Sequence, residues 1–448
     1  MEGLTLSAKG RVMTLPRESC NAMPERYDSV LSTRAMKGLA WAVCFFGAGG
    51  LAQLAATSAR PLPKQGLPTA AAAAPATAGR VRTYYIAAEE IDWDYAPLGI
   101  DMMTGKPFEG TAAAYTQPGP NHIGHIYRKA VYREYTDGTF TTRKPRLPQD
   151  EYLGLLGPVL RAEVGDTLKI VFKNNASRPY NMYPPDSFDP KDPVDTAIPD
   201  ATGNAVDDSD DMVQPGATFT YEWEVRQRAG PEADDPSSIV QVYYSHVSQY
   251  KDVASGLVGA VIVTRKGQAN ADGTPKDVDR EIVALFTAFN ENESWYAQEN
   301  VSAHISAADQ KALEGREANF SDAQGYFTFT GTGFAETNYK YSVNGYLYGD
   351  GPVMSVKQGQ RVRWYLLDMG DVGSLNFHTP HWHGNTVLSH GTRRDTIFLL
   401  SLGTETADMV PDAPGLWLFH CHLDDHMEAG MMARYEVLPA ATTTADTK

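Results

Sequence analysis

Hydrophobic and polar residues alternate over short stretches along most of the chain from Arg80 onward. The alternation is clear at 218–223, 260–264 and 395–401, and Gly, Pro, Asn and Asp residues separate such stretches. A period of two residues is typical of a β-strand with one buried face. Short strands with turns between them are typical of β-sandwiches. The pattern therefore predicts an all-β protein.

Two parts of the chain repeat each other. The stretch 163–172 is echoed by 357–366, each with a turn glycine before an alternating strand, and 242–246 is echoed by 418–422. An internal repeat indicates two copies of one structural unit, and 448 residues are too many for one ordinary core. We therefore expect two β-sandwich domains at 80–265 and 278–440, a linker at 266–277 and a tail at 441–448.

Residues 1–79 are expected to be a leader and a linker. An apolar run at 38–56 ends in small residues, and an Ala- and Pro-rich stretch follows it. The run is typical of a signal peptide with its cleavage site, and the second stretch of a flexible linker. The polar residues ahead of Met36 are unusual for a secretory signal, so Met36 as the true start and an uncleaved anchor both stay open. The chain is predicted to be exported, to the periplasm or the outside of the cell.

Charge and cysteine content narrow the possible partners. The net charge of -16 argues against nucleic acid, because neutralising phosphates needs clustered Lys and Arg. Of three cysteines, Cys20 and Cys44 lie in the leader, so Cys421 is alone in the body and no intrachain disulfide is possible there. A single thiol in an oxidising compartment is safest when a metal holds it.

Metal-ligating side chains gather in two stretches. The stretch 419–431 holds one cysteine, three histidines and a methionine, and 377–384 holds three more histidines. One thiolate, two imidazoles and a weak thioether are the ligands of a blue, or type 1, copper centre. The spacing predicts such a centre with the ligands His378, Cys421, His426 and Met431.

Strand geometry separates the other histidines from this set. Successive side chains of a strand point to opposite faces, so His420 and His422 face away from Cys421, while His381 and His383 share a face. We expect these four behind the same strand, as ligands of a second copper site. Scattered core histidines and one inert cysteine are the alternative, but the joint spacing argues against it.

Several longer segments carry a family resemblance: 82–89, 154–158, 176–180, 251–257 and 290–296. With the two histidine stretches, they make both repeats similar to the cupredoxin domains of multicopper oxidases, in the branch of ceruloplasmin, hephaestin and coagulation factors V and VIII. The resemblance covers about residues 80–440. It implies Greek-key β-sandwiches and an oxidoreductase that passes electrons from a type 1 copper to an interdomain histidine copper site, with O2 as acceptor.

The first repeat departs from the family pattern. Ser245 stands at the position of Cys421 and Tyr250 at that of His426, so no type 1 copper is expected in the first domain. Of the histidines that the first domain of the family gives to a trinuclear copper cluster, only His246 is present. The resemblance implies that His246, with His383 and His420, completes a single three-histidine copper site.

This ligand count leaves other functions open. A type 1 copper beside one three-histidine copper also resembles copper nitrite reductases, in which the position of His381 carries the catalytic proton-relay residue. The remaining alternative is a non-catalytic electron-transfer cupredoxin. A non-catalytic scaffold like the coagulation-factor domains disagrees with the intact Cys421 set.

The electron donor and the assembly are also expectations from the resemblance. Iron oxidation in the ceruloplasmin branch is associated with carboxylates beside the type 1 copper, and the matching positions are Glu336 and Asp425, with Tyr341 where a histidine is expected. Carboxylate oxygens could bind Fe(II), although exposed acids are ordinary on an acidic protein. Six-domain relatives close their domains into a ring, and three copies of a two-domain chain would supply the same six domains. The resemblance therefore predicts a homotrimer in which His246 reaches the next subunit.

Overall fold

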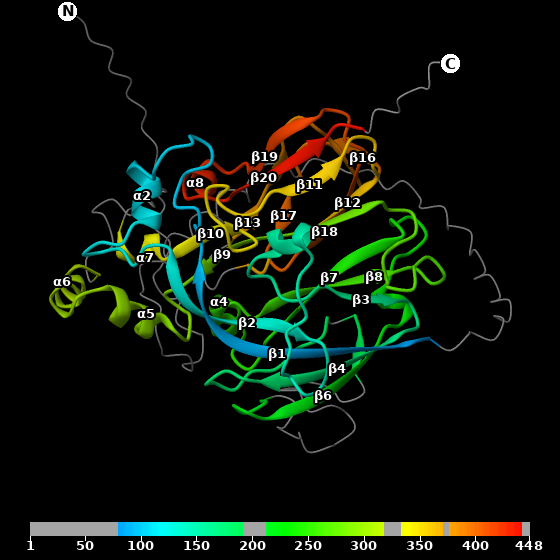
Figure 1. The fold of residues 1–448 in the computed structure, drawn as a ribbon, viewed down its shortest axis with the longest axis horizontal. Coiled ribbons are helices and arrows are strands. Elements are labelled where there is room, and N and C mark those ends of the chain that lie inside the picture. Colours follow the sequence, from blue (N-terminus) through cyan, green and yellow to red (C-terminus); the bar gives the residue numbers. More distant parts are fainter. Residues whose placement is uncertain (1–78, 186, 191–211, 318–332, 371–375, 441–448) are drawn as a thin grey trace, which may run out of the picture. The chain divides into compact units, whose positions relative to one another are not determined.

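The computed structural model describes residues 79–185, 187–190, 212–317, 333–370 and 376–440. The expected leader, up to residue 78 and with Cys20 and Cys44, and the expected tail lie outside these residues. Within them, strands predominate and the helices are short (Figure 1). The predicted all-β class and the β-sandwich architecture are confirmed.

Residues 81–264 contribute two sheets. The first is five-stranded with the order β2-β1-β4-β6-β5, and the second is three-stranded with the order β3-β8-β7. Their bounds are β1 (Val81–Asp94), β2 (Ile126–Tyr135), β3 (Leu160–Glu163), β4 (Thr167–Asn174), β5 (Asp189–Pro190), β6 (Thr218–Glu224), β7 (Ser238–Tyr244) and β8 (Val258–Thr264). We call this part the first sandwich.

Residues 280–438 contribute the other sheets, and we call this part the second sandwich. A six-stranded sheet has the order β10-β9-β12-β18-β15-β16, a four-stranded sheet β11-β20-β19-β14, and β13 pairs with β17. The bounds are β9 (Arg280–Asn290), β10 (Tyr339–Val343), β11 (Met354–Lys357), β12 (Val362–Leu367), β13 (Phe377–His378), β14 (Pro380–Trp382), β15 (Val387–Ser389), β16 (Thr392–Arg394), β17 (Leu399–Leu400), β18 (Thr404–Met409), β19 (Gly415–Cys421) and β20 (Met432–Leu438).

The internal repeat has a structural counterpart in the two sandwiches. In the first, β3 leads through a turn at Gly165 into β4, which lies parallel to β1; in the second, β11 leads through a turn at Gly359 into β12, parallel to β9. Both glycines have positive φ, 98° and 80°, which explains the glycine in each copy. The boundary between two domains at 266–277 stays a prediction, although no described strand of one sandwich pairs with a strand of the other.

Short helices connect the strands. They are α2 (Gly110–Thr116), the 3-10 turns η1 (Pro148–Leu153) and η2 (Gln227–Ala229), α4 (Gln249–Ser255), α5 (Ala297–His304), α6 (Ala307–Glu317), α7 (Phe334–Thr337) and α8 (Asp424–Glu428). In the described part of the chain, none of the helices has the length and the apolar character that a membrane crossing requires.

The prediction of a strand at 395–401 was only partly right. Only β17 (Leu399–Leu400) is a regular strand there. The preceding residues run along β14 with irregular bonds: the Trp382 N–H donates to the Asp395 carbonyl (2.9 Å) and the Ile397 N–H to the Pro380 carbonyl (3.0 Å). Because Pro380 has no N–H, the ladder between the two segments cannot be continuous.

An aromatic core fixes the strand that carries Cys421. Phe419 of β19 is fully buried, and its ring lies 4.9 Å from the rings of Trp364 and Trp382, measured between centroids. Trp364 belongs to β12, in a different sheet from β14 and β19, which carry Trp382 and Phe419, so the packing holds the two sheets of the second sandwich together. Replacing a buried Phe with Ala typically costs about 3–5 kcal/mol, so Phe419→Ala should loosen the strand next to the metal-ligating residues.

A buried ion pair ties the two sandwiches together. Lys129 of β2 contacts Glu291, just after β9, and both side chains are at most 1% exposed. The Tyr95 hydroxyl also donates to Glu291, at 2.5 Å. Removing one partner of a buried pair typically costs about 3–5 kcal/mol, because the other charge is left uncompensated in the interior.

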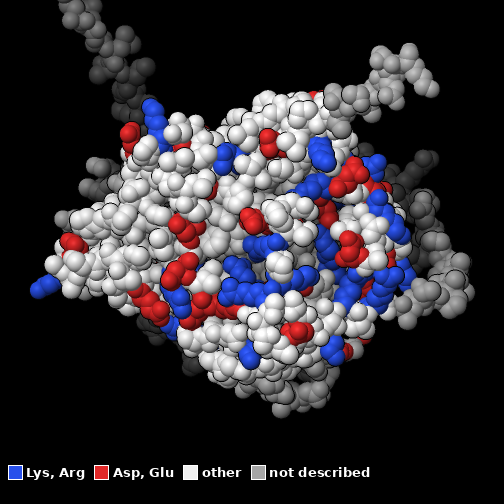
Figure 2. All heavy atoms as spheres, viewed as in Figure 1, with Lys and Arg blue, Asp and Glu red and all other residues white. Residues whose placement is uncertain are grey.

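Charged side chains are distributed unevenly over the surface. Despite the net charge of -16, Figure 2 shows Lys and Arg gathered in a band across the middle of one face, with Asp and Glu beside them. Ion pairs of the described residues include Arg128 with Glu90 (3.2 Å) and Arg280 with Asp150 (3.1 Å). On the face shown, positive charge is therefore largely accompanied by negative charge.

Candidate metal centre

The loop between β19 and β20 brings three of the predicted ligands together. Cys421 ends β19, His426 lies in α8, and Met431 directly precedes β20. Two backbone bonds close the loop: the Cys421 N–H donates to the Met431 carbonyl (3.1 Å) and the Met431 N–H to the His426 carbonyl (2.9 Å). Gly430 makes the reversal possible, since its φ is +110° and a Cβ there would lie 2.9 Å from the Tyr348 ring.

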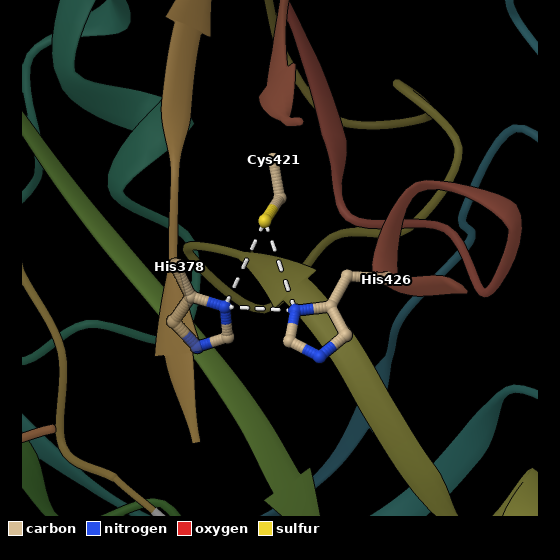
Figure 3. A group of neighbouring side chains, drawn as sticks. All are labelled: His378, Cys421 and His426. Carbon is tan, nitrogen blue, oxygen red and sulfur yellow. Dashed lines mark hydrogen bonds between the residues drawn. The ribbon is translucent and has the colours of Figure 1, made fainter. Parts of the chain in front are cut away.

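The fourth ligand comes from β13, and three donor atoms converge on one point (Figure 3). The Nδ1 atoms of His378 and His426 lie 3.1 Å apart, and the Cys421 sulfur lies 4.0 and 3.7 Å from them. Donors bound to one metal at about 2.0–2.3 Å are separated by roughly 3–4 Å, so this spacing suits a single ion. Met431 is fully buried and is joined to the group through the backbone bonds of the loop.

Burial sets the protonation of these side chains. Desolvation lowers the pKa of His378 well below its ordinary value, with a further contribution from His426. It raises the pKa of the Cys421 thiol, while the Thr379 N–H, 3.4 Å from the sulfur, acts in the opposite direction. The imidazoles are therefore neutral, as a metal ligand must be, and a bound metal would displace the thiol proton.

A second group of histidines lies on the other face of β19. The strand β14 pairs antiparallel with β19 and places His381 opposite His420. One nitrogen each of His381, His383 and His420 lies within 4.8 Å of the others, and the Nε2 atoms of His383 and His420 are 3.1 Å apart. Strand parity thus separates the histidines as the sequence predicts.

Backbone carbonyls orient two of these rings. The Nδ1 of His420 lies 2.7 Å from the Cys421 carbonyl, and that of His381 lies 3.0 Å from the Asp395 carbonyl. A carbonyl can only accept, so each Nδ1 carries the proton and each Nε2 keeps its lone pair for a metal. Burial lowers the pKa of His420 to about 4, so that ring is neutral near pH 7.

The remaining predicted histidines differ in position. His422 is exposed, and its ring centroid lies 4.9 Å from that of His381, so it borders the three-histidine group. His246 follows β7 in the first sandwich and stacks on Tyr183 at 4.6 Å, outside that group. Within one chain the structure brings together His381, His383 and His420, but does not add His246.

Polar side chains occupy the corresponding place in the first sandwich. Ser245, at the position of Cys421, is fully buried and donates from its hydroxyl to Asp252 Oδ2 at 2.7 Å. The Ser248 N–H donates to the same oxygen (3.0 Å) and the Trp295 indole to Oδ1 (2.8 Å). Tyr250, at the position of His426, is 59% exposed. Ser245 and Asp252 thus form a hydrogen-bonded network where the second sandwich has a metal-ligand set.

Carboxylates lie beside His426. Asp425 Oδ2 is 3.8 Å from His426 Nε2, and Glu336 of α7 accepts a hydrogen bond from the Tyr115 hydroxyl at 3.1 Å. Burial raises the pKa of Glu336, and the negative charge of Asp425 raises it further. The charge of Asp425 thus disfavours the ionised form of Glu336, and a nearby cation would offset that effect.

Comparisons with known proteins show what this chain is similar to. Residues 321–441 match the sequence profile described as Multicopper oxidase. Human Ferroxidase HEPHL1 is 39% identical over 359 residues, covering 80% of this chain and 29% of that protein. The chain contains a multicopper oxidase domain in residues 321–441. Rat hephaestin is 37% identical (80% and 29% covered) and sheep ceruloplasmin 38% (82% and 33%), so the chain spans a third or less of these relatives.

These sequence relatives confirm the resemblance to the ceruloplasmin and hephaestin branch of the multicopper oxidases. A solved multicopper oxidase covers 80% of this chain at 21% identity, with a TM-score of 0.44, and a copper nitrite reductase from Nitrosomonas europaea covers the same share at 16% identity, with a TM-score of 0.46. Copper is also the metal that the donors fit, since one thiolate and two imidazoles form the ligand set of a blue copper centre.

Three neighbours of the metal centre were not found from the sequence. Asp368 lies 3.6 Å from His378, Thr379 donates to the cysteine sulfur, and Tyr115 bonds to Glu336. No ligand spacing marks these residues, because Asp368 and Tyr115 lie outside both histidine stretches and Thr379, next to His378, acts through its backbone N–H. The one local signal is the position of Asp368, an acidic residue directly after the fully apolar end of β12.

Proposed function

We propose that this protein is a copper-dependent oxidoreductase that takes electrons from a donor beside His426 and delivers them to O2 at the three-histidine group. One observation carries the proposal: the two donor groups lie on opposite faces of β19, at the adjacent residues His420 and Cys421. Copper held there would supply the one-electron redox chemistry that these side chains lack.

Each ligand has a distinct task in this proposal. His378, Cys421, His426 and Met431 would hold the type 1 copper, and their burial would exclude water from it. The peptide between Cys421 and His420 provides a covalent connection, and the bond from His420 Nδ1 to the Cys421 carbonyl shortens it. His381, His383 and His420 would face the second copper, with His422 at the border of the group.

Fe(II) is the donor that we favour. Glu336 and Asp425 would bind it through carboxylate oxygens and stabilise the ferric product, since hard oxygen ligands favour the higher charge. The raised pKa of Glu336, due in part to Asp425, supports a place for a cation between them. Human Ferroxidase HEPHL1, 39% identical over the matched residues, supports the same donor by its name.

A nitrite reductase is the second candidate, favoured by a single copper site of His246, His383 and His420 beside a type 1 ligand set. In this alternative, His381 acts as the catalytic proton relay. Its Nδ1 lies 3.0 Å from the Thr396 hydroxyl, which could pass a proton onward. A non-catalytic electron-transfer protein is the third possibility and predicts no turnover with either acceptor.

We further propose that the chain is exported and works as a homotrimer. The second copper would take His246 from the first sandwich of a neighbouring subunit, a head-to-tail contact that closes after three repeats. The position of His246 outside the histidine group of its own chain supports this assembly. The type 1 ligands plus one three-histidine site then give about two coppers per chain.

Copper stoichiometry, spectroscopy and turnover together test the proposal. The purified protein, loaded with Cu(II), should show the intense visible band and narrow EPR splitting of a type 1 site, and should consume O2 when Fe(II) is supplied. Nitrite consumption without O2 consumption would favour the second candidate. A copper-loaded protein without the visible band would refute the type 1 assignment.

A further inference from the structure

A buried carboxylate faces the second ring nitrogen of His378. Asp368 directly follows β12, and its Oδ1 lies 3.6 Å from His378 Nε2, with both side chains 0% exposed. The carboxylate is held in place by the backbone. Its Oδ1 accepts from the Gly370 N–H (2.8 Å), and the Asp368 N–H donates to the Gly403 carbonyl (3.1 Å).

The ring of His378 uses its two nitrogens differently. Nδ1 faces Cys421 and His426 (Figure 3), and a neutral imidazole that binds metal through Nδ1 carries its proton on Nε2. Among the described residues, His378 Nε2 has no hydrogen-bond partner within the ordinary distance limit. The carboxylate of Asp368, 3.6 Å away, is therefore the group that can accept this proton. Metal-ligating histidines generally donate their other N–H to a carboxylate, a carbonyl or water.

The two histidines of the centre differ in this respect. Asp425 lies 3.8 Å from His426 Nε2, but its side chain is 27% exposed, whereas that of Asp368 is completely buried. Water screens a charge at the surface and leaves a buried one almost unscreened. Asp368 should therefore act on its histidine much more strongly than Asp425 does.

We propose that Asp368 is a positioning residue for the type 1 copper, which holds His378 with Nδ1 toward the metal and lowers the reduction potential of the site. The inference rests on the proposed copper centre. A buried negative charge stabilises Cu(II) more than Cu(I), because the oxidised ion carries one more positive charge. The same carboxylate makes the imidazole a stronger donor, which also favours the oxidised form.

The substitution Asp368→Asn tests the proposal, because Asn keeps the shape and removes the charge. The variant, loaded with Cu(II), should keep the blue band, and its redox equilibrium with a reference couple should shift at least tenfold toward Cu(I). For one electron, tenfold corresponds to about 59 mV. Asp350→Asn is the matched control, since Asp350 is also buried, at 1% exposed, but accepts from the Leu98 and Gly99 amides. The redox equilibrium of this control should stay within about twofold of the wild type.

A blue Asp368→Asn protein with an unchanged potential would overturn the proposal. If that variant does not fold, the wild-type protein carrying diamagnetic Cu(I) provides a second measurement. Nitrogen-15 NMR of labelled histidine should show His378 protonated at Nε2, with a slowly exchanging N–H, and protonation elsewhere or fast exchange would contradict the role of Asp368. A wild-type protein that never turns blue would refute the copper centre itself, which is a different outcome.

Discussion

The ring of Tyr341 lies over the ring of His426, with the centroids 4.8 Å apart and the planes tilted by 34°. Tyr341 also stands where the family resemblance predicts a histidine beside the type 1 copper. The proposed iron site therefore has two carboxylates, Glu336 and Asp425, and lacks an imidazole. A phenol is a poorer ligand for Fe(II) than an imidazole, because at neutral pH it keeps its proton.

Restoring the histidine should improve iron binding. In Tyr341→His, we expect the KM for Fe(II) to fall by about tenfold, the effect of one additional ligand worth roughly 1.4 kcal/mol. Steady-state oxidation of Fe(II) measures this. The control is Tyr339→His. The ring centroid of Tyr339 lies 6.3 Å from that of Tyr341, and it is Tyr341 whose ring lies against His426. Equal effects of both substitutions would mean that position 341 is not special.

Removing the carboxylates should have the opposite effect. Glu336→Ala and Asp425→Ala should each raise the KM for Fe(II) by about tenfold or more and leave the blue band intact, since substrate binding is lost and the redox centre is not. Oxidation of an organic donor separates the two effects. Asp424→Ala, at the exposed neighbour of Asp425, is the control. An equal loss with both donors would exclude an iron site at these acids.

The thiolate of Cys421 should be responsible for the colour. Cys421→Ser should be colourless when loaded with copper, because the visible band is a thiolate-to-copper transition. The variant should keep the copper of the three-histidine group, so that metal analysis finds about one copper per chain where the wild type has about two. Retained colour in Cys421→Ser would contradict the ligand assignment.

His246 should be needed for the second copper but not for the first. His246→Ala should lose one copper per chain and the reduction of O2, while the blue band persists, because the type 1 ligands all belong to the second sandwich. His390→Ala, at a side chain that is 70% exposed, should change neither. Light scattering should give three chains per particle, and a fully active monomer would contradict the proposed ring.

Asp350 should make the stability of the protein depend on pH. Burial raises the pKa of Asp350 from 3.8 to about 6, so the folded chain binds this proton more tightly than the unfolded chain does. Stability is therefore lost as pH rises from about 4 to 6 and is constant above. Thermal unfolding of wild type and Asp350→Asn should show a gap in favour of the variant that widens over this interval. A gap that does not change with pH would contradict the shift.

Ligands close in sequence could be predicted, and their supporting residues could not. Cys421, His426 and Met431 belong to one loop, so their spacing in the sequence is enough to predict that they lie close together. Strand parity then separates His420 from Cys421, because β19 is regular up to its last residue. Both arguments use only local rules of strand geometry.

Contacts between distant elements were beyond such rules. Asp368 follows β12 and His378 ends β13, strands of different sheets, and Tyr115 reaches Glu336 from the helix α2, more than two hundred residues away in the chain. The predicted strand at 395–401 was too long for a related reason. Its alternation is real, with Ile397 and Leu399 buried, but its partner segment contains Pro380 and cannot complete the ladder.

The hydrogen-bonded network of Ser245 and Asp252 bears on which part of a newly made chain depends on copper. A cysteine and two histidines packed into a core need an ion before their charges and lone pairs are satisfied, whereas the hydroxyl, carboxylate and indole groups around Asp252 satisfy one another. The polar groups around Asp252 therefore need no metal, although Trp295 joins them from the second sandwich. Of the residues that the structure describes, only those of the second sandwich form ligand sets that a metal would complete, so a newly made chain should be a colourless precursor that needs both copper and assembly with its neighbours.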